Sequence, residues 1–230
     1  MNVAIIVAAG RGTRMNDPAG LLKQFRLLAG VPLLIHTLRR FEQAASVNSI
    51  IVVVPAESRT EFLQLMERFN IAKLSRVVAG GKTRLLSVQR GLAEVDSVTT
   101  SIVLVHDGAR PFVSPTEIDA CVRAAEETGS AILAVPVTDT IKEVQGEIII
   151  RTHTRAALRH ALTPQCFRYT LLREAYAAAA RDRVNDATDD SQLVERLGYP
   201  VRVLDADPRN IKLTRPEDWA IAERMLEEVS

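Results

Sequence analysis

Hydrophobic positions along the chain follow two alternating patterns. Short runs that are apolar at almost every position alternate with longer segments whose apolar residues recur every three or four positions. The first pattern is typical of strands buried on both faces, and the second of amphipathic helices. The expected strands are Val3–Ala8, Ser49–Val54, Arg76–Ala79, Ser101–Val105 and Ala131–Val135. The expected helices are Pro32–Ala44, Glu57–Phe69, Thr83–Val95 and Pro115–Thr128. This order predicts an α/β fold with a mostly parallel sheet flanked by helices.

The alternation is interrupted after Val135. Two strand-like runs, Thr140–Val144 and Glu147–Thr152, surround Gln145-Gly146, which is typical of a β-hairpin. We expect this hairpin to form an arm of approximately residues 137–155 that protrudes from the main sheet. The alternation then resumes with helices near Leu171–Ala180 and Ser191–Leu197, a strand at Val201–Leu204 and a closing helix from Glu217. With no internal repeat and no linker, residues 1–230 are expected to form a single domain.

Composition narrows the range of functions. The chain has 230 residues, of which 47% are hydrophobic, enough for one well-filled core. Its 29 basic and 28 acidic residues leave a net charge of +1, which argues against a broad nucleic-acid or membrane surface. The apolar run Val3–Ala9 lacks a basic flank and is too short for a secretory signal, and no run approaches the ~20 apolar residues of a membrane span. We therefore expect a soluble, cytoplasmic protein with neither nucleic acid nor membrane as a partner.

The two cysteines, Cys121 and Cys166, form no C-x-x-C motif. Because Cys121 lies in an apolar helical register with Ile118 and Val122, we interpret it as a reduced thiol in the core.

The first strand leads into a glycine-containing loop, Ala8-Ala9-Gly10-Arg11-Gly12-Thr13-Arg14-Met15. A dinucleotide-binding G-x-G-x-x-G motif would need glycine in place of Met15. Two interpretations stay open. The glycines permit an ordinary turn, or they let backbone N–H groups approach a polyphosphate, with Arg14 and Lys23 adding positive charge.

A second glycine segment, Gly80-Gly81-Lys82-Thr83, resembles the end of a P-loop. The complete motif would require glycine at position 76, where this chain has Arg76, and a P-loop NTPase is therefore excluded. The glycine pair either lets the chain pass close to a ligand base or turns the chain before the next helix.

The apolar strand Ser101–Val105 runs into His106 and a carboxylate, Asp107, followed by Gly108. Ligands of open α/β sheets bind at the carboxyl ends of strands, and Mg²⁺ binds one or two carboxylates together with substrate phosphates. Asp107 is therefore a candidate metal ligand, the alternative being a cap for the next turn. The four histidines show no zinc spacing, and His106 is interpreted as structural.

The segment Asn210–Asp218 is expected to be a short strand feeding a helix. Thr214 is the candidate N-cap, with Glu217 completing a capping box. Lys212 inside that apolar strand either extends to solvent or points into the site.

Short motifs occur in a fixed order along nearly the whole chain. They are Ala8-Ala9-Gly10-x-Gly12-x-Arg14-Met15, Lys23-Gln24-Phe25, Gly80-Gly81 with Arg84 and Ser87-Val88, His106-Asp107-Gly108-Ala109-Arg110-Pro111, Pro136-Val137-x-Asp139-Thr140-x-Lys142, Arg155, Leu162-Thr163-Pro164-Gln165, Thr188-Asp189 and Asn210-Ile211-Lys212-x-Thr214-x-Pro216-Glu217-Asp218. Each is weak alone, but the ordered set resembles the 2-C-methyl-D-erythritol 4-phosphate cytidylyltransferases of the non-mevalonate isoprenoid pathway. The resemblance implies a Rossmann-like nucleotide-diphospho-sugar transferase fold with a protruding β-hairpin arm.

The same resemblance implies a magnesium-dependent transfer of CMP from CTP to 2-C-methyl-D-erythritol 4-phosphate, with release of pyrophosphate. A phosphate monoester is mostly ionised at neutral pH, since its second pKa is about 6, and the nucleophile then needs no general base. The enzyme must instead bring polyanions together and neutralise charge in the transition state.

Roles for individual residues follow from the resemblance. Arg14 and Lys23 would hold the triphosphate, Lys212 the α-phosphate and Asp107 the Mg²⁺. The nucleotide would be bound by Ala8, Ala9, Gly10, Gly12, Gly81, Ser87 and Gly108. The polyol phosphate would be bound by Thr140, Arg155, Thr163 and Thr188. The arm would reach into a second subunit, so that Thr140 and Arg155 serve the site of the partner in a homodimer.

Three alternatives remain at this stage. A ribitol 5-phosphate cytidylyltransferase would share much of the nucleotide half, although the sequence Asp107-Gly108-Ala109-Arg110-Pro111 favours the erythritol enzyme. A related transferase could use UTP or GTP. A catalytically silent nucleotide-binding module would bind nucleotide without releasing pyrophosphate.

Overall fold

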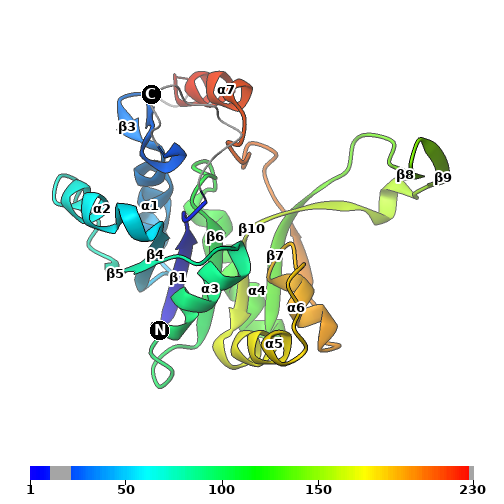
Figure 1. Ribbon diagram of the computed structural model, residues 1–230, viewed down its shortest axis with the longest axis horizontal. Coiled ribbons are helices and arrows are strands. Elements are labelled where there is room, and N and C mark those ends of the chain that lie inside the picture. Colours follow the sequence, from blue (N-terminus) through cyan, green and yellow to red (C-terminus); the bar gives the residue numbers. More distant parts are fainter. Residues whose placement is uncertain (11–21, 228–230) are drawn as a thin grey trace.

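The computed structural model describes residues 1–10 and 22–227 and is built around one seven-stranded sheet (Figure 1). The strand order is β11-β7-β10-β6-β1-β4-β5. All neighbouring strands pair in parallel except β10, which is antiparallel to both β6 and β7. The strands are β1 (Asn2–Val7), β4 (Ser49–Val54), β5 (Leu74–Ala79), β6 (Ile102–Asp107), β7 (Ser130–Pro136), β10 (Arg159–Arg168) and β11 (Arg202–Asp205). The predicted α/β architecture with a mostly parallel sheet is confirmed.

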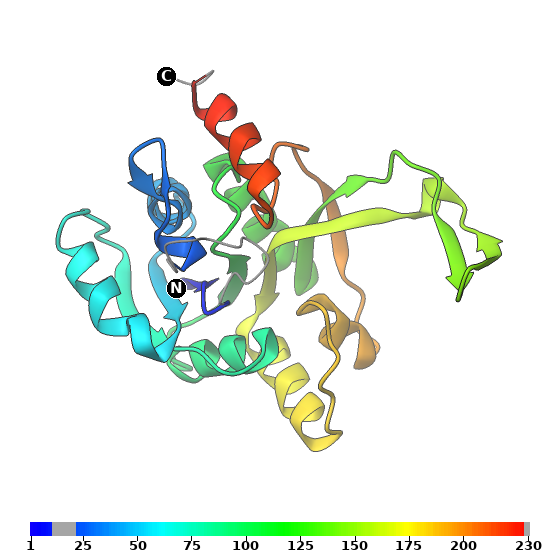
Figure 2. The same cartoon turned by 45° about the horizontal axis from the view of Figure 1, so that its top comes forward.

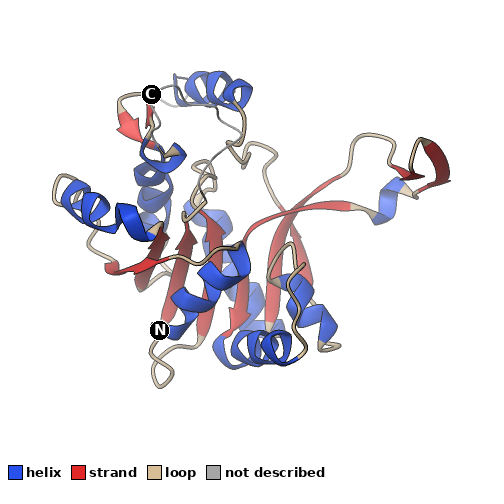
Figure 3. Ribbon diagram, viewed as in Figure 1, coloured by secondary structure: helices blue, strands red, loops and turns tan. Residues whose placement is uncertain are grey.

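Helices cover both faces of this sheet (Figure 3). They are α1 (Leu33–Gln43), α2 (Arg59–Met66), α3 (Arg84–Ala93), α4 (Pro115–Thr128), α5 (Tyr169–Arg181), α6 (Ser191–Arg196) and α7 (Pro216–Glu227). Alternate strand residues belong to two separate cores, since successive side chains of a strand point to opposite faces. Ala4 and Ile6 of β1 pack with α1, α2 and α4, whereas Val3 and Ile5 pack with α3, α5 and α6.

Helix α4 spans the predicted residues, and its signals are local. The Ser114 hydroxyl accepts the backbone N–H of Glu117, whose carboxylate in turn accepts the N–H of Ser114. Pro115 occupies the first turn, and Gly129 ends the helix with a left-handed φ of 92°. These are the start and stop signals expected of a helix. Cys121 on this helix is buried, and both cysteines are free, as predicted for Cys121.

Strand β10 was not predicted, and it changes the sheet. It inserts between β6 and β7, with a register irregularity between Ala161 and Gln165. Leu162-Thr163-Pro164-Gln165 lies within it, and its buried residues include polar ones. Proline is normally confined to edge strands or bulges, so this run did not indicate an interior strand. A second, two-stranded sheet of β2 (Leu27–Leu28) and β3 (Val31–Pro32) was also not predicted.

The predicted arm is present. Strands β8 (Lys142–Gln145) and β9 (Ile148–Thr152) form an antiparallel hairpin that stands away from the body, and the long β10 leads back from it (Figure 2). The turn lies one residue later than expected. Gln145 pairs with Ile148, which leaves Gly146 and Glu147 as the loop, and Gly146 has a φ of 60°. Glycine supplies this positive φ at the first turn position at little cost.

The C-terminal segment differs from the prediction. Residues 210–213 form no strand, and α7 begins at Pro216. The backbone N–H groups of Thr214 and Arg215 donate to the Asp218 carboxylate, rather than Glu217 completing a capping box with Thr214. Leu213 and Trp219 form a third, small core with Leu28 and Leu33, which seats α7 against the β2–β3 hairpin.

Among the described residues, no helix is long and apolar enough to cross a membrane. That residues 1–230 form a single domain remains a prediction.

Candidate active site

A pocket of about 880 Å³ lies at the carboxyl ends of β1, β4 and β6. The chain leaves β1 toward β4 on one side, while β6 pairs with β1 on the other side, where Val7 lies opposite Asp107. Open α/β sheets bind ligands at such a reversal of strand order. The sheet topology therefore places the pocket where a ligand site is expected.

One wall of the pocket is formed by backbone at close approach. A Cβ added to Gly80 would lie 2.2 Å from Cβ of Ala9, and one added to Gly81 would lie 2.4 Å from Cβ of Leu86. The Ser87 hydroxyl, on the first turn of α3, accepts the N–H of Gly81 and donates to Thr83 O at 2.8 Å. The glycine pair therefore lets the turn before α3 pack directly on the loop after β1.

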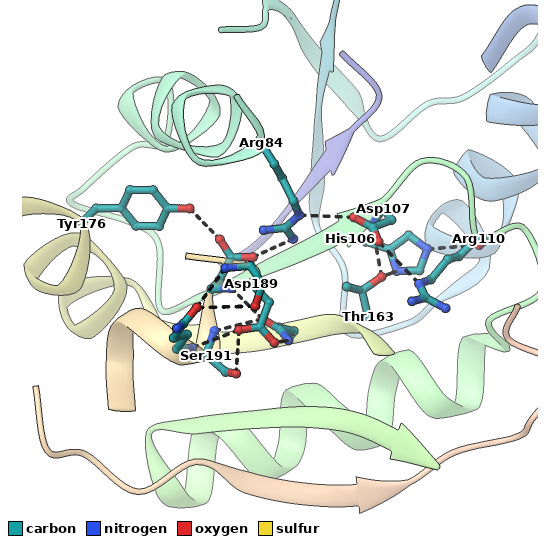
Figure 4. Close-up of polar contacts among 12 residues, drawn as sticks. Arg84, His106, Asp107, Arg110, Thr163, Tyr176, Asp189 and Ser191 are labelled. Atoms are coloured by element: carbon teal, nitrogen blue, oxygen red, sulfur yellow. Dashed lines mark hydrogen bonds and ion pairs between the residues drawn. The ribbon is translucent and has the colours of Figure 1, made fainter. Parts of the chain in front are cut away.

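Asp107 at the end of β6 also lines the pocket, and three cations surround it. Lys212 Nζ lies 2.8 Å and Arg110 Nε 3.5 Å from its Oδ2, and Arg84 Nε lies 3.4 Å from its Oδ1 (Figure 4 shows Arg84, Asp107 and Arg110). Burial opposes ionisation of this carboxyl group, but the positive charges of Lys212, Arg84 and Arg110 outweigh burial and hold the pKa of Asp107 well below its usual range. Asp107 is therefore an anion at every physiological pH.

The segment that carries Lys212 is anchored from two sides. Arg110 donates to Asn210 O at 2.9 Å, and Leu213 N–H donates to Ala109 O at 2.9 Å. The amide of the fully buried Asn210 donates to Thr163 O in β10 at 2.9 Å. These bonds keep an irregular segment in a fixed position beside the pocket.

Lys23 reaches the same region from the other side of the pocket. It lies in a short 3₁₀ turn, Lys23–Phe25, and its Nζ donates to Leu213 O at 2.7 Å. Arg26 stacks over the ring of Trp219 in α7, with 4.7 Å between its guanidinium carbon and the ring centre. Helix α7 therefore holds both lysine-bearing segments.

His106 is buried on the opposite face of β6 from Asp107. Its Nε2 lies 3.1 Å from Arg110 O, which can only accept, so Nε2 carries the proton. Its Nδ1 then accepts from the Thr163 hydroxyl at 3.0 Å, and that oxygen accepts the N–H of Asp107 at 3.1 Å (Figure 4). Burial lowers the pKa of His106 to about 4, and the ring is neutral. The interpretation of His106 as structural agrees with this geometry.

The predicted site residues fall into three groups. The structure brings nine of them together in the lining of the pocket: Ala8, Ala9, Gly10, Lys23, Gly81, Ser87, Asp107, Gly108 and Lys212. Gly12 and Arg14 lie outside the described residues. Thr163 lies beneath Asp107, with its hydroxyl already engaged by His106 and by the Asp107 N–H. The predicted role of Thr163 in substrate binding remains a prediction.

The remaining substrate residues lie apart from the pocket in this chain. Thr140 and Arg155 are exposed in the arm, where Arg155 donates to Thr138 O at 2.8 Å. Thr188 is exposed near α6, and its N–H donates to Gln192 Oε1. None of the three lines the pocket among the described residues.

Three residues around Asp107 were not assigned roles from the sequence. Arg84 and Arg110 were recognised only as parts of motifs, and the fully buried Asp190 was not noticed at all. An acidic residue just before a helix, such as Asp190 before α6, usually serves the helix itself. Only the pairing of these segments in space reveals what they contact.

The pocket fits Mg²⁺ only if phosphates complete its coordination. The described residues contain no cluster of three or more His, Cys, Asp or Glu side chains that could hold a metal by themselves. Asp107 presents a single ionised carboxylate to the pocket. Mg²⁺ is commonly bound through one or two carboxylates plus substrate phosphates, so this donor set fits the ion.

The fold and the site together define the class: a doubly wound α/β protein whose pocket, with lysines and arginines around one carboxylate, suits a polyanionic nucleotide. A family model described as IspD, 2-C-methyl-D-erythritol 4-phosphate cytidylyltransferase, matches residues 2–228. The chain belongs to this family.

Individual relatives agree with the family assignment. A 2-C-methyl-D-erythritol 4-phosphate cytidylyltransferase of Geobacillus kaustophilus is 46% identical over 223 residues, covering 97% of this chain and 96% of the relative. The crystal structure of the enzyme of that name from Thermus thermophilus superposes with a TM-score of 0.78 at 35% identity, covering 99% of this chain and all of the other. The 4-diphosphocytidyl-2C-methyl-D-erythritol synthase of Anaerococcus prevotii gives a TM-score of 0.85 at 28% identity, covering 99% and 98%. The recognition made from the motifs is confirmed.

Proposed function

We propose that this chain is a cytidylyltransferase that joins CTP and 2-C-methyl-D-erythritol 4-phosphate to give 4-diphosphocytidyl-2-C-methyl-D-erythritol and pyrophosphate. The observation that carries the proposal is Lys212 beside Asp107 in a pocket whose other wall is glycine backbone. Membership of the family, with relatives of this name at 46% identity, supports the same reaction.

The residues of the chain account for the chemistry without a general base. The phosphate oxygen of the polyol phosphate attacks the α-phosphorus of CTP, the bond to the β-phosphate breaks, and pyrophosphate leaves. Lys212 neutralises charge on the α-phosphate, and Lys23 and Arg14 hold the outgoing phosphates. Asp107 would hold Mg²⁺, which supplies Lewis-acid neutralisation of the phosphate oxygens when it is bound.

The base of the nucleotide is placed against the glycine wall. Ser87 fixes the Gly81 backbone, and a side chain at position 80 would clash with Ala9 and displace this segment. The backbone at Ala8, Ala9, Gly10 and Gly108 is the remaining part of the proposed nucleotide site, together with Gly12. Backbone N–H and C=O groups that line a pocket suit a planar base whose edge is read by hydrogen bonds.

A homodimer is part of the proposal. The arm exposes a run of large apolar side chains, with Val144 57%, Ile148 72%, Ile149 58% and Ile150 54% exposed. An isolated two-stranded hairpin is marginally stable at best, and such a surface needs a partner to cover it. A second copy of the chain related by a two-fold axis would cover it reciprocally, and would bring Thr140 and Arg155 to the site of the neighbour.

A cytoplasmic location also belongs to the proposal, and cell fractionation would test it.

The decisive experiment is a pyrophosphate-release assay across four NTPs, each with 2-C-methyl-D-erythritol 4-phosphate or ribitol 5-phosphate. We expect turnover only with CTP and the erythritol phosphate, and only when a divalent cation is present. Faster turnover with ribitol 5-phosphate would contradict the assignment of the polyol phosphate. Faster turnover with UTP or GTP would contradict the assignment of the nucleotide. Nucleotide binding without any pyrophosphate release would indicate a catalytically silent module.

A further inference from the structure

A buried network links the carboxylate in the pocket to a second carboxylate outside it. Arg84, the first residue of α3, contacts Asp107 through Nε at 3.4 Å (Figure 4). A terminal nitrogen of the same side chain lies 2.8 Å from Asp190 Oδ2. The side chain of Arg84 is 25% exposed and lines the pocket, whereas that of Asp190 is fully buried. One guanidinium group therefore joins the end of β6 to the start of α6.

The far end of this network is held firmly. The Tyr176 hydroxyl of α5 donates to Asp190 Oδ1 at 2.5 Å, while Arg84 takes Oδ2. Gln165 of β10 accepts the backbone N–H groups of Asp190 and Ser191, each at 3.0 Å, and its amide donates to Asp189 at 2.8 Å. Burial works against the charge of Arg84, but Asp190 and then Asp107 outweigh it and raise the pKa of Arg84.

Fold stability alone does not explain this arrangement. Replacing a buried ion pair by apolar residues of similar volume is often neutral or stabilising, because desolvation of both charges offsets their attraction. The guanidinium fork is rigid, so fixing one edge of it on Asp190 also fixes the direction of the Nε–H that faces Asp107. Without Asp190, the only carboxylate that contacts Arg84 among the described residues would be Asp107.

We propose that Asp190 is a positioning residue for the reaction, acting through Arg84 to hold Asp107 in place in the pocket. The inference rests on the proposed cytidylyltransferase function. Asp190 takes a terminal nitrogen of the guanidinium, so that Arg84 faces Asp107 with Nε, 3.4 Å from Oδ1, and the Asp107 carboxylate is held in one orientation in the pocket.

The test is a double-mutant cycle on pyrophosphate release with Asp190→Asn, Arg84→Ala and the pair. Asparagine keeps the size of the side chain but has an acceptor oxygen at only one of the two positions that Arg84 and Tyr176 use in Asp190, so one of the two donors loses its acceptor. Since a 1 Å misplacement of a reacting group can cost about 100-fold, we expect Asp190→Asn to lower kcat by roughly 10- to 100-fold. The KM for CTP should change much less. In the Arg84→Ala background, Asp190→Asn should lower kcat no further.

A purely structural role predicts different results. Asp190→Asn would then lower kcat by the same factor with or without Arg84, or KM and kcat would change together, and either result would overturn the proposal. Val194→Ala is the matched control, because Val194 is fully buried in α6 but has an apolar side chain that cannot take part in the hydrogen bonds and ion pairs of the network. It should lower the unfolding temperature while leaving kcat unchanged.

Two further measurements keep the outcome decisive. If Asp190→Asn does not fold, Tyr176→Phe is the substitute variant, because it removes the hydroxyl that donates to the same carboxylate. We expect Tyr176→Phe to lower kcat in the wild-type background and to have no effect on kcat in the Arg84→Ala background. Thermal unfolding tests the ion pair without any activity. Arg84→Ala leaves Asp190 buried and unpaired, so adding Asp190→Asn should raise the unfolding temperature again. Absence of this thermal rescue contradicts the inference, whereas a wild-type chain that releases no pyrophosphate contradicts the proposed function.

Discussion

The ammonium group of Lys212 lies 2.8 Å from a carboxylate oxygen of Asp107, although one residue ends β6 and the other lies just before α7. Lys212 is 39% exposed, and Asp107 is 11% exposed between two arginines. The lysine is therefore the most accessible of the three cations around the carboxylate. A long, flexible side chain in this position can exchange its contact with Asp107 for one with a phosphate group.

Substitution Lys212→Ala should remove activity more than stability. Losing one preorganised group that stabilises transition-state charge typically lowers kcat by about 10²–10³. Because Arg84 and Arg110 still pair with Asp107 and Lys212 is partly exposed, the unfolding free energy should change by less than about 1 kcal/mol. Steady-state kinetics and urea unfolding measure the two effects. Near-normal kcat/KM in the variant would remove Lys212 from the proposed mechanism.

Asp107→Asn tests the metal assignment. The substitution keeps the shape of the side chain but leaves Arg84, Arg110 and Lys212 without their common anion. We expect the variant to fold with a loss of about 1–3 kcal/mol and to lose its magnesium-dependent activity. Activity should be titrated with Mg²⁺ for both proteins. A variant that retains turnover with an unchanged magnesium requirement would show that Asp107 is no metal ligand.

His106 should make stability depend on pH. Its pKa is about 4 in the fold, compared with about 6.5 for an unfolded chain. Between these values the unfolded chain binds a proton that the folded chain does not, so stability falls as pH drops from about 6.5 to about 4, by roughly 3 kcal/mol in total. His106→Gln should lose this dependence. Urea unfolding at pH 7 and pH 5 should therefore show a smaller difference for the variant, and equal differences would contradict the assignment.

The close approach of Gly80 to Ala9 predicts a specific rescue. Gly80→Ala would place two methyl groups 2.2 Å apart, so the glycine segment must move away from the loop after β1. Such overpacking typically costs about 1–3 kcal/mol, and we expect it to weaken CTP binding. Adding Ala9→Gly removes the clash and should restore most of the affinity, as measured by titration calorimetry. If the double variant binds CTP no more tightly than Gly80→Ala, the clash with Ala9 is not the cause of the weakened binding.

The arm predicts complementation between inactive chains. Arg155→Ala and Lys212→Ala each inactivate every site of their own homodimer. If Arg155 serves the partner, a mixed dimer contains one site with both residues intact. Random mixing should then restore about a quarter of wild-type activity. If the arm serves its own chain, mixing restores nothing, and a monomer in sedimentation at assay concentration would also contradict the proposal.

The parallel strands and the helices could be predicted because their signals are local. β4 and α4 have the predicted boundaries, since continuous β-branched runs and a Ser114–Glu117 capping box depend only on neighbours in the sequence. The end of β6 at Asp107 also follows from local pattern, because a charge after an apolar run marks where a buried strand reaches an edge of the sheet. Hairpin residues likewise indicated an arm.

Tertiary structure decided the rest, because the deciding contacts join distant segments. No local pattern marked β10 as an interior strand, since Pro164 and the polar Thr163 and Gln165 are costly inside a sheet unless particular partners satisfy them. Those partners are His106, Asp107 and the start of α6, which lie on other elements. The sequence by itself determined the parallel strands, the helices, the arm and the residue types of the site. Only the tertiary structure determined that Lys212, Arg84 and Arg110 converge on one carboxylate. The energy of a charge pair depends on the distance between the charges and on their burial, and the hydrophobic periodicity of the sequence specifies neither.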